Sequence, residues 1–507
     1  MRERKTRLWQ QVLLWQQVLL KVTSRPRNFE KQRAAKLARQ PANFMLLAVT
    51  FVWLSTGIAT LAQTLPADTA QPKLSLAQAI ALAEKNYPRI RASLEQQVAA
   101  QGGVSVARTA YLPRTDILWQ TNRATANNVY GLLLPQGVVP SISGPVLAAD
   151  NGRSAWSSAG GALVSWQPFD FGLRRAQVNS AQQGATAATA GLNLTRLDVE
   201  VATASAYLDL VTSEQLLDIA RANLDRLQVF ANAVHVLVDN QLRAGADAAQ
   251  ADADLAVGKT QLIQANTNVA VRRAALADFV GIPTASLEVE DAHLLAAEPS
   301  EQSAPASLAT HPLAEQEAAL VNQRQAQLSV ITHSYVPQFN TQAALFGRGT
   351  GTALSGPFPG GMNGLAPDTM NWAAGVQVTF PAFDFFSLRA QKTVQEANVR
   401  AEQARYQQTL DDLSAQVQQA QAQLEGAKQI ALNTPVELAA ARASEQQQRA
   451  RFQAGLATVV EVAVSESLLT QAEADDAVAR LNVWRALAGV AAARGDLAPF
   501  LAQLTQP

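Results

Sequence analysis

Histidines and paired acidic residues are the side chains that could support catalysis or bind a metal, and their spacing supports neither. Metal ligands come at close, regular spacing, whereas the 4 histidines of this sequence are scattered. The acidic pairs Asp411-Asp412 and Asp475-Asp476 lie in helical sequence, where a solvated helix face explains them. The sequence has no cysteine, no glycine-rich phosphate loop and no nucleophile elbow. The histidines are His235, His293, His311 and His333. We therefore expect no enzyme, no metal site and no cofactor.

Charge is distributed unevenly along the chain. The 507 residues contain 41 basic and 41 acidic side chains, but residues 1–62 hold 11 Lys or Arg and only Glu3 and Glu30. Subtraction leaves 30 basic and 39 acidic residues in 63–507, a net charge near −9 (30 minus 39). Nucleic-acid-binding proteins present basic surface to the phosphates, so this balance argues against nucleic acid as a partner.

The apolar run Phe44–Ala62 follows a basic segment and precedes polar, proline-containing sequence. This pattern predicts a secretory signal, with Thr60 and Ala62 at the −3 and −1 positions of the cleavage site. The run is also just long enough for a retained membrane anchor, which stays an alternative. About forty residues precede the apolar run, which is long for a signal peptide. A translation start further downstream therefore stays an alternative. We assign residues 1–62 as a signal or targeting segment.

An internal duplication organises the rest of the chain. Both halves run in the same order: helix, proline, strand, loop, strand, very long helix, glycine, long helix. This order predicts a first repeat at 63–283, a linker at 284–311 and a second repeat at 312–507. The paired motifs are Asn86-Tyr87-Pro88 with Thr310-His311-Pro312, Tyr111-Leu112-Pro113 with Tyr335-Val336-Pro337, Phe169-Asp170-Phe171 with Phe383-Asp384-Phe385, Arg243-Ala244-Gly245 with Gln453-Ala454-Gly455, and Arg273–Ala277 with Arg485–Ala488.

Two pairs of extended segments alternate with a period of two, which predicts strands with one apolar, aromatic face and one polar face. The apolar face carries Trp119 and Trp166 in the first half and Trp372 and Phe380 in the second. Segments rich in Gly and Pro separate the strands of each pair at 131–152 and 347–367, and we expect them to be loops. An alternative is a soluble sheet whose apolar face packs on helices.

The sequence from Phe169 to Ile282 contains no proline and has apolar residues at helical spacing. We expect a helical hairpin that turns near Gly245, with a first arm of roughly 70 residues and about 100 Å. A helix of that length belongs to a coiled-coil-like assembly or crosses a gap. The second half repeats the pattern, except that Pro435 lies inside the long arm and should kink it.

Four strands with one lipid-compatible face cannot close into a barrel, and an open strand edge is not tolerated in hydrocarbon. The residues therefore require more than one chain, without fixing how many.

At this point the repeated motifs resemble those of the TolC-like outer-membrane efflux proteins, over Leu74 to Phe500. The resemblance implies a mainly α fold with a membrane β-barrel, in which long helical hairpins form a periplasmic α-barrel. It implies a homotrimer in the bacterial outer membrane, where four strands per chain build a 12-stranded barrel in contact with lipid. The linker at 284–311 and the C-terminal end would form an equatorial belt. The protein would then function as the exit duct of a tripartite efflux or type I secretion system. An inner-membrane pump and a periplasmic adaptor (membrane fusion) protein would deliver the substrates to it.

The resemblance also implies where functional residues lie. The adaptor-docking tips of the hairpins fall on Ala244, Gly245 and Ala246 and on Ala454, Gly455 and Leu456, where glycine would supply a left-handed turn and room for another backbone. A helix cap without a partner explains these glycines equally well. The acidic periplasmic aperture would fall on Glu461. Asp252, with Asp247 and Asp254, could add charge from the other hairpin, although a solvated helix face explains these three as well. The family's second acidic position is Val464 here, and its basic latch position is Ala457, so the gating residues depart from the pattern.

A periplasmic adaptor or structural coiled-coil protein is the alternative from another class. Such a protein would also have a secretion signal and a long hairpin. It would have one hairpin flanked by compact β domains, however, and no need for two aromatic, alternating strand pairs. Those strand pairs favour the channel.

Overall fold

The computed structural model describes residues 73–125, 154–290, 294, 307–351, 361–380 and 383–504. The chain divides into two compact units, Met1–Thr69 and Ala70–Pro507, and every described residue belongs to the second. The apolar run Phe44–Ala62, the loop at 131–152 and part of the loop at 347–367 lie outside the described residues. Across the described ranges, every helix is too short or too polar to serve as a membrane span.

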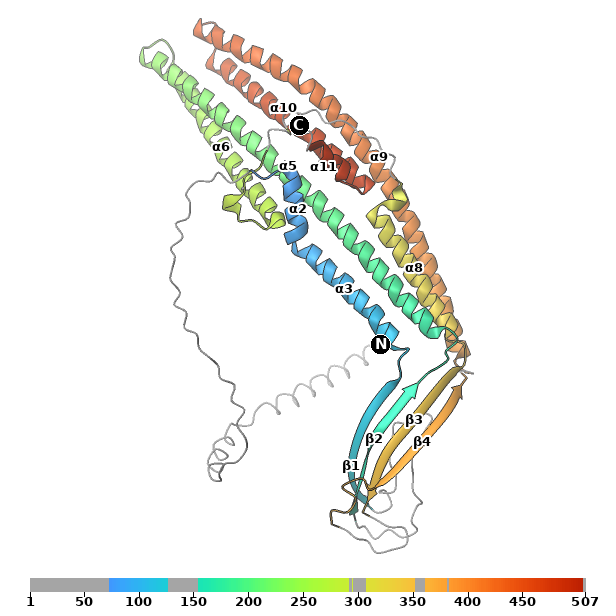
Figure 1. Ribbon diagram of the computed structural model, residues 1–507. Coiled ribbons are helices and arrows are strands. Elements are labelled where there is room, and N and C mark those ends of the chain that lie inside the picture. Colours follow the sequence, from blue (N-terminus) through green and yellow to red (C-terminus); the bar gives the residue numbers. More distant parts are fainter. Residues whose placement is uncertain are drawn as a thin grey trace, which may run out of the picture. The chain divides into compact units, whose positions relative to one another are not determined.

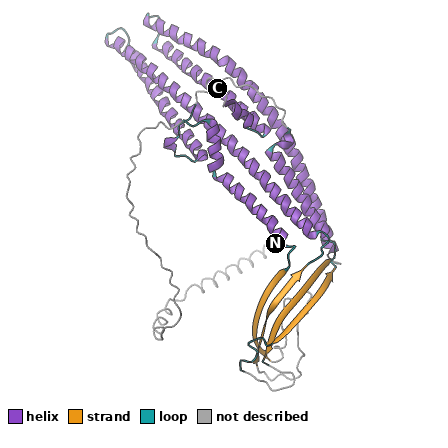
Figure 2. Cartoon of the chain, viewed as in Figure 1, coloured by secondary structure: helices purple, strands orange, loops and turns teal. Residues whose placement is uncertain are grey.

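The described chain consists mainly of helices and contains one four-stranded sheet (Figures 1 and 2). Apart from one extra helix at the start of the first half and one at the end of the second, the elements of the two halves follow the same order, as the duplication predicts. The first half comprises α2 (Leu76–Asn86), α3 (Pro88–Thr109), β1 (Arg114–Thr125), β2 (Ser154–Trp166), α5 (Leu173–Asp239) and α6 (Gly245–Val280). The second comprises α8 (Pro312–His333), β3 (Gln338–Thr350), β4 (Thr369–Thr379), α9 (Asp384–Gln453), α10 (Val459–Arg494) and α11 (Ala498–Leu504). Short 3-10 turns occur at Thr284–Ser286 and Leu308–Thr310.

The two hairpins match each other without an insertion or a deletion. Phe169 and Phe383 precede the long helices, and Gly281 and Gly495 end the returning helices with left-handed φ angles of 71° and 81°. Both pairs are separated by 214 residues (383 minus 169; 495 minus 281). Buried residues recur at the same offset, for example Leu210 and Leu424. We call residues that are 214 apart within the hairpins equivalent.

The long arms confirm the predicted length. Helix α5 has 67 residues and α9 has 70, which at ~1.5 Å per residue is on the order of 100 Å. Helix α9 continues through Pro435 without a break. The bend that proline should produce there stays a prediction.

The sheet has the order β1-β2-β3-β4, and each neighbouring pair is antiparallel. The register places Ile117, Ala162, Leu345 and Trp372 in one row across the four strands, and all four are exposed. This apolar face agrees with the sequence. Strands β1 and β4 each have one neighbour in the described sheet, so both edges are open.

The opposite face of the sheet is less polar than we expected. Leu163 and Phe346 are each only 2% exposed there and pack with Ala159 and Ala344. A Cβ added to Gly161 would lie 2.5 Å from the Phe346 Cβ, so this glycine lets the two strands and the phenyl ring pack closely. Alternation identifies which residues share a face but does not show that the face is in water, and the face expected to be polar contains this apolar cluster.

The main core surrounds the middle of α5. The Tyr207 hydroxyl lies within hydrogen-bond distance of the carbonyl oxygens of Glu290 (2.6 Å) and Leu74 (2.9 Å), and its one hydrogen can be donated to either. The Trp484 indole nitrogen donates to the carbonyl oxygen of Leu294 at 2.9 Å. Phe500 of α11 makes an edge-to-face contact with Trp484 in the same core. The described parts of 284–311 and the C-terminal end therefore contribute to one core, and the equatorial belt stays a prediction.

Helix α2 lies beside α5 and was not foreseen as a separate helix. Ser75 caps its N-terminus, accepting from the Gln78 N–H at 3.3 Å, while the Gln78 side chain accepts from the Ser75 N–H at 3.1 Å. This reciprocal capping box is readable in the sequence as Ser followed three residues later by Gln.

Candidate functional site

The turns at the hairpin tips have the same backbone geometry. In the first, the N–H groups of Gln241 and Leu242 donate to the carbonyl oxygens of Val238 (2.9 Å) and Leu237 (2.8 Å). In the second, those of Gly455 and Leu456 donate to Phe452 (3.0 Å) and Arg451 (2.8 Å). Each is the paired hydrogen-bond pattern that ends a helix with a left-handed residue. That residue is Gln241 (φ 60°) in the first turn and Gly455 (φ 75°) in the second.

The prediction that Gly245 supplies a left-handed turn was therefore wrong. Gly245 is the first residue of α6, follows the N-cap Ala244 and is absent from the positive-φ residues. The sequence pairing of Gly245 with Gly455 was shifted by four residues, because an Ala-Gly dipeptide recurs by chance on opposite sides of the turn. The equivalent of Gly455 is Gln241 (455 minus 214). The pairing of Arg273 with Arg485 was shifted by two for the same reason.

Each tip presents one exposed leucine. Leu242 and Leu456 are equivalent, and each is 70% exposed. A Cβ added at Gly245 or Gly455 would meet no atom within 4 Å, so both tips have open space around the backbone. Leu242 was missed because the turns were misaligned. A constant offset of 214 applied from Phe169 onward would have found it.

The two tips are joined within one chain. The Arg243 guanidinium donates to the carbonyl oxygen of Ala457 at 3.0 Å and lies 4.7 Å from the centroid of the Phe452 ring. The rings of Phe230 and Phe452 are 5.2 Å apart. Ala457, where the resemblance placed a basic latch, thus provides a backbone acceptor, and its equivalent Arg243 provides the cation.

Glu461 has a local partner at the start of α10. Its carboxylate accepts from the backbone N–H of Thr458 at 2.7 Å and from the Thr458 hydroxyl at 2.9 Å, which closes a capping box. These hydrogen bonds lower the pKa of Glu461. The equivalent residue is Asp247 in the first turn of α6. The structure therefore assigns Glu461 a capping role, and a ring of Glu461 side chains at an aperture stays a prediction.

Asp252 does not lie with Glu461 but pairs across the first hairpin. Its carboxylate is 2.9 Å from Nε2 of His235, and both side chains are about half exposed. The equivalent residues in the second hairpin are Arg449 and Glu466, whose side chains also meet at 2.9 Å. The duplication therefore preserves a bridge between a base on the first arm and an acid on the second.

Replacing Asp252 by Asn is expected to lower the pKa of His235. The hydrogen bond and the negative charge of Asp252 raise that pKa above the ordinary 6.5. A raised pKa means that the pair stabilises the fold fully below the unfolded pKa, and that this contribution is lost as the pH rises through the folded pKa. NMR titration of the His235 ring protons measures the shift. Asp254→Asn is the control, because Asp254 accepts from Gln250 instead; an equal shift in both variants would exclude the pairing as the cause.

A buried ionic network, which sequence reasoning missed, joins the two hairpins. Glu466 is 1% exposed and accepts from Arg226 of α5 at 3.1 Å and from Arg449 of α9 at 2.9 Å. Arg226 also donates to Glu473 (3.0 Å) and Thr470 (3.2 Å). Burial and the nearby Glu445 carboxylate raise the pKa of Glu466, whereas the two guanidinium groups lower it. In the sequence these residues look like ordinary charges on polar helices.

The residues predicted to face lipid are exposed on one face of the sheet. Trp119 is 68% exposed, Trp166 45%, Trp372 78% and Phe380, just after β4, 68%. The Trp166 indole nitrogen donates to the carbonyl oxygen of Tyr111 at 3.1 Å, near the junction with the helices. Their contact with lipid stays a prediction.

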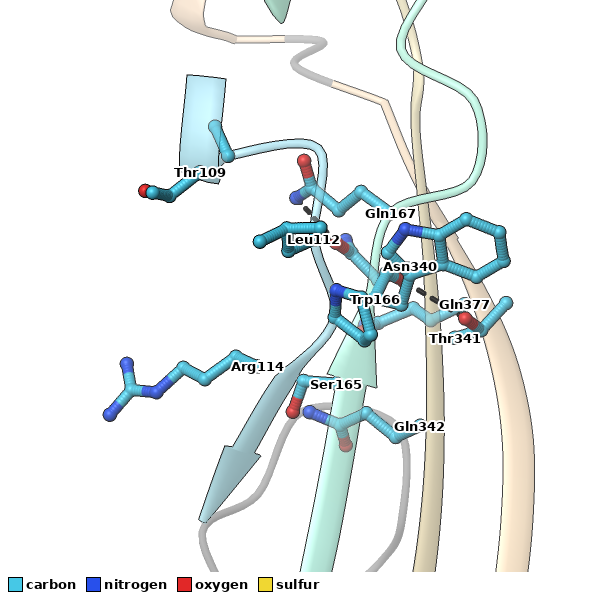
Figure 3. Close-up of a pocket in the computed structure, with 12 residues that line it drawn as sticks. Thr109, Leu112, Arg114, Ser165, Trp166, Gln167, Asn340, Thr341, Gln342 and Gln377 are labelled. Atoms are coloured by element: carbon cyan, nitrogen blue, oxygen red, sulfur yellow. Dashed lines mark hydrogen bonds between the residues drawn. The ribbon is translucent and has the colours of Figure 1, made fainter. Parts of the chain in front are cut away.

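A cavity of about 630 Å³ lies where the sheet meets the helices (Figure 3). Gln167 donates to Asn340 there at 2.6 Å, and Thr341 donates to the carbonyl oxygen of Trp166 at 2.9 Å. The lining also includes Arg114 and Gln377 but no carboxylate and no histidine. It offers hydrogen bonds but no acid–base pair. Among the described residues, no group of three or more His, Cys, Asp or Glu side chains could hold a metal ion.

Replacing Gly455 by Ala is expected to destabilise the second turn by about 1 kcal/mol, because a Cβ disfavours positive φ. Gly245→Ala is the matched control: Gly245 has no positive φ and has open space, so no loss is expected there. Hydrogen exchange of the Leu456 amide, which is bonded to Arg451, reports the local change. Equal protection of this amide in both variants and the unsubstituted protein would contradict the assignment of the left-handed residue.

An exposed apolar face on a sheet with open edges, joined to two hairpins of very long helices, defines a class: channel proteins of the bacterial outer membrane that extend into the periplasm. The family model of the outer membrane efflux proteins matches residues 79–281 and 305–496. The chain belongs to the outer membrane efflux protein family. No curated protein sequence matches it.

Solved structures with the same fold include several outer-membrane channels. VceC, an outer membrane protein from Vibrio cholerae, is 18% identical with a TM-score of 0.67, over 83% of this chain and 96% of that one. The MtrE outer membrane channel of Neisseria gonorrhoeae, solved in an open state, is 19% identical with a TM-score of 0.66, over 83% and 89%. The CmeC outer membrane channel of Campylobacter jejuni is 15% identical with a TM-score of 0.67, over 83% and 85%.

Proposed function

We propose that this protein is the outer-membrane exit duct of a tripartite efflux or type I secretion system and works as a homotrimer. Substrates would enter from an inner-membrane pump through a periplasmic adaptor protein and leave passively through the tube. The family to which the chain belongs supports efflux across the outer membrane. It also favours the channel over the alternative of a periplasmic adaptor or structural coiled-coil protein.

The open-edged sheet is the observation that carries the proposal. Strands β1 and β4 are both edges, and the row Ile117, Ala162, Leu345, Trp372 is exposed on one face. In hydrocarbon every backbone polar group needs a partner, so the edge of β4 must pair with β1 of another copy. Three copies would give twelve strands, within the range of outer-membrane barrels. Outer-membrane lipid would then contact the apolar face.

The test combines membrane fractionation, mass in detergent and conductance. We expect the protein in outer-membrane fractions, a mass of three chains, and ion conductance when it is added to planar bilayers. Recovery as a soluble periplasmic monomer would exclude the proposal. An assembly of another size that still conducts would exclude the trimer but keep the channel.

Contact of an adaptor with the tips is part of the same proposal. The equivalent leucines Leu242 and Leu456 are the exposed apolar groups that such a contact would use, next to Gly245 and Gly455. Leu456→Asp in the assembled protein should reduce capture of the cognate adaptor without changing the oligomeric mass. Unchanged capture in Leu242→Asp, Leu456→Asp and the double variant would contradict docking at the tips.

A further inference from the structure

The cavity where the sheet meets the helices is lined mainly by side chains that form hydrogen bonds without carrying charge (Figure 3). Three carboxamides lie in one row across the strands: Gln167 donates to Asn340 at 2.6 Å, and the register pairs Asn340 with Gln377. A fourth, Gln342, lies two residues further along β3 and is paired with Ser165 of β2. We call Gln167, Asn340, Gln342 and Gln377 the carboxamide cluster.

The hollow exists because the pairing of β1 with β2 ends early on this side of the sheet. Strand β1 begins at Arg114, which the register pairs with Ser165, so the pairing stops two residues before Gln167. The turn between α3 and β1 borders the cavity there instead of a strand, and its Leu112 is 66% exposed. The cavity therefore has a polar wall and an apolar edge.

The described lining of the cavity contains one charged side chain, and a neighbour compensates its charge. Arg114 donates from Nε to the Asp116 carboxylate at 3.1 Å. Each carboxamide of the cluster has an oxygen that accepts hydrogen bonds and an NH2 group that donates two. The cavity therefore offers donors and acceptors together, and it offers a charged solute no uncompensated charge of either sign.

The duplication shows that the sheet does not need carboxamides at these positions. The helix-to-strand boundaries of the two halves, at residues 111 and 335, are 224 residues apart (335 minus 111). At that offset Asn340 corresponds to Asp116, and Gln338 corresponds to Arg114. The first half thus carries an ion pair where the second half carries two carboxamides. Because the same strand positions accept charged residues, the uncharged set on β3 points to contact with a ligand.

The carboxamide cluster lies on the sheet face opposite to the exposed apolar one. Asn340 and Gln342 are each an odd number of residues from Leu345, and Gln377 is an odd number from Trp372. Gln377 is exposed, and Asn340 and Gln342 are partly exposed. In the proposed barrel the face opposite to lipid lines the interior. A solute inside the duct therefore has access to the cluster.

We propose that the carboxamide cluster binds uncharged, hydroxyl-rich solutes of the oligosaccharide class inside the duct. A sugar hydroxyl both donates and accepts hydrogen bonds, as a carboxamide does, and the apolar edge at Leu112 suits the C–H face of a sugar ring. The volume of about 630 Å³ falls within the roughly 300–1,000 Å³ of small-molecule sites. This inference rests on the proposed function and names a class of solute that the interior of the duct recognises.

The test measures ion conductance of the assembled protein in planar bilayers while maltotriose is added. We expect maltotriose to lower the current with saturation. Polyethylene glycol of similar size, which has ether acceptors but donors only at its ends, should lower the current less and without saturation. Asn340→Ala and Gln377→Ala should each raise the half-saturating concentration of maltotriose severalfold. The matched control is Gln120→Ala, because Gln120 lies on the same face but about 20 Å along β1 from Arg114, outside the cavity.

The outcomes separate this inference from the proposed function. If the protein conducts but maltotriose and polyethylene glycol lower the current alike, the site is wrong and the proposed function stands. That comparison uses the unsubstituted protein, so it holds even where a variant fails to assemble. An equal effect of Gln120→Ala and Asn340→Ala would also contradict the site. If the protein does not conduct at all, the proposed function fails first. Saturation by maltotriose that Asn340→Ala weakens and Gln120→Ala does not supports the inference.

Discussion

Trp372→Arg is expected to abolish most of the assembled protein recovered from outer membranes. Trp372 is 78% exposed in the middle of β4 and aligned with Leu345 on the apolar face. An arginine facing lipid near the bilayer midplane costs about 2–4 kcal/mol in outer-membrane barrels. Three copies carry the substitution, so the cost is multiplied in the assembly. The measurement is the urea dependence of folding into lipid vesicles, together with the amount of heat-resistant oligomer in outer-membrane fractions.

Gln377→Arg is the matched control for this prediction. It lies on the same strand, an odd number of residues from Trp372, and therefore points to the opposite face. It should cost little, because that face does not contact lipid in the proposed barrel. Equal losses in the two variants would contradict the assignment of the lipid-facing side, even if both proteins assemble.

Arg226→Met is expected to lower the free energy of unfolding of the helical hairpins by about 3 kcal/mol, the lower end of the cost of removing one partner from a buried charge pair. Glu466 is 1% exposed and would keep only Arg449. Arg221→Met is the control on the same helix. Its partner Asp218 is 66% exposed, and such a pair contributes about 0–1 kcal/mol.

The loss caused by Arg226→Met should depend on pH. Burial already raises the pKa of Glu466, and removing Arg226 takes away one of the charges that oppose this rise. A carboxyl whose folded pKa is above its unfolded value stabilises the fold as the pH falls through the folded pKa, because the buried charge is neutralised. The variant should therefore lose less stability near pH 5 than near pH 8 in chemical denaturation. A loss independent of pH would assign the effect to packing instead of to the carboxylate.

The order of helices and strands could be predicted because it follows from local sequence patterns, which reflect interactions between residues close together along the chain. Two-residue alternation gave the strands, and proline-free sequence with helical spacing gave the arms. Tyr111-Leu112-Pro113 and its counterpart gave the helix-to-strand boundaries. These features rely on neighbours along the chain, so the sequence shows them directly.

The turns and the charge partners could not be predicted in the same way. Gln241 occupies the left-handed position that glycine occupies in the second turn, and no local preference indicates that. Asp476 belongs to a pair expected on a solvated face, yet it is 7% exposed and accepts from Thr434 of α9 at 3.1 Å. The partners of Arg226 are 240 to 247 residues away along the chain. Such contacts depend on how the hairpins pack against each other.

Fold class, family and the exposed apolar strand face agree with the sequence-based expectations. The repeat boundaries, the lipid contacts of Trp119, Trp166, Trp372 and Phe380, and the aperture role of Glu461 and Asp252 stay predictions. The left-handed turn expected at Gly245 was wrong, and the sheet face expected to be polar contains the apolar cluster of Leu163 and Phe346.

The two hairpins contain the same number of residues. From Phe169 to Gly281 and from Phe383 to Gly495 the residue count is the same. Deleting one heptad from α9 alone would withdraw its tip by about 10 Å at ~1.5 Å per residue. Such a change would preserve the apolar pattern of α9 but would move the tip of the second hairpin relative to the tip of the first. We therefore expect deletions of equal length in both hairpins to be better tolerated than a deletion in one hairpin alone.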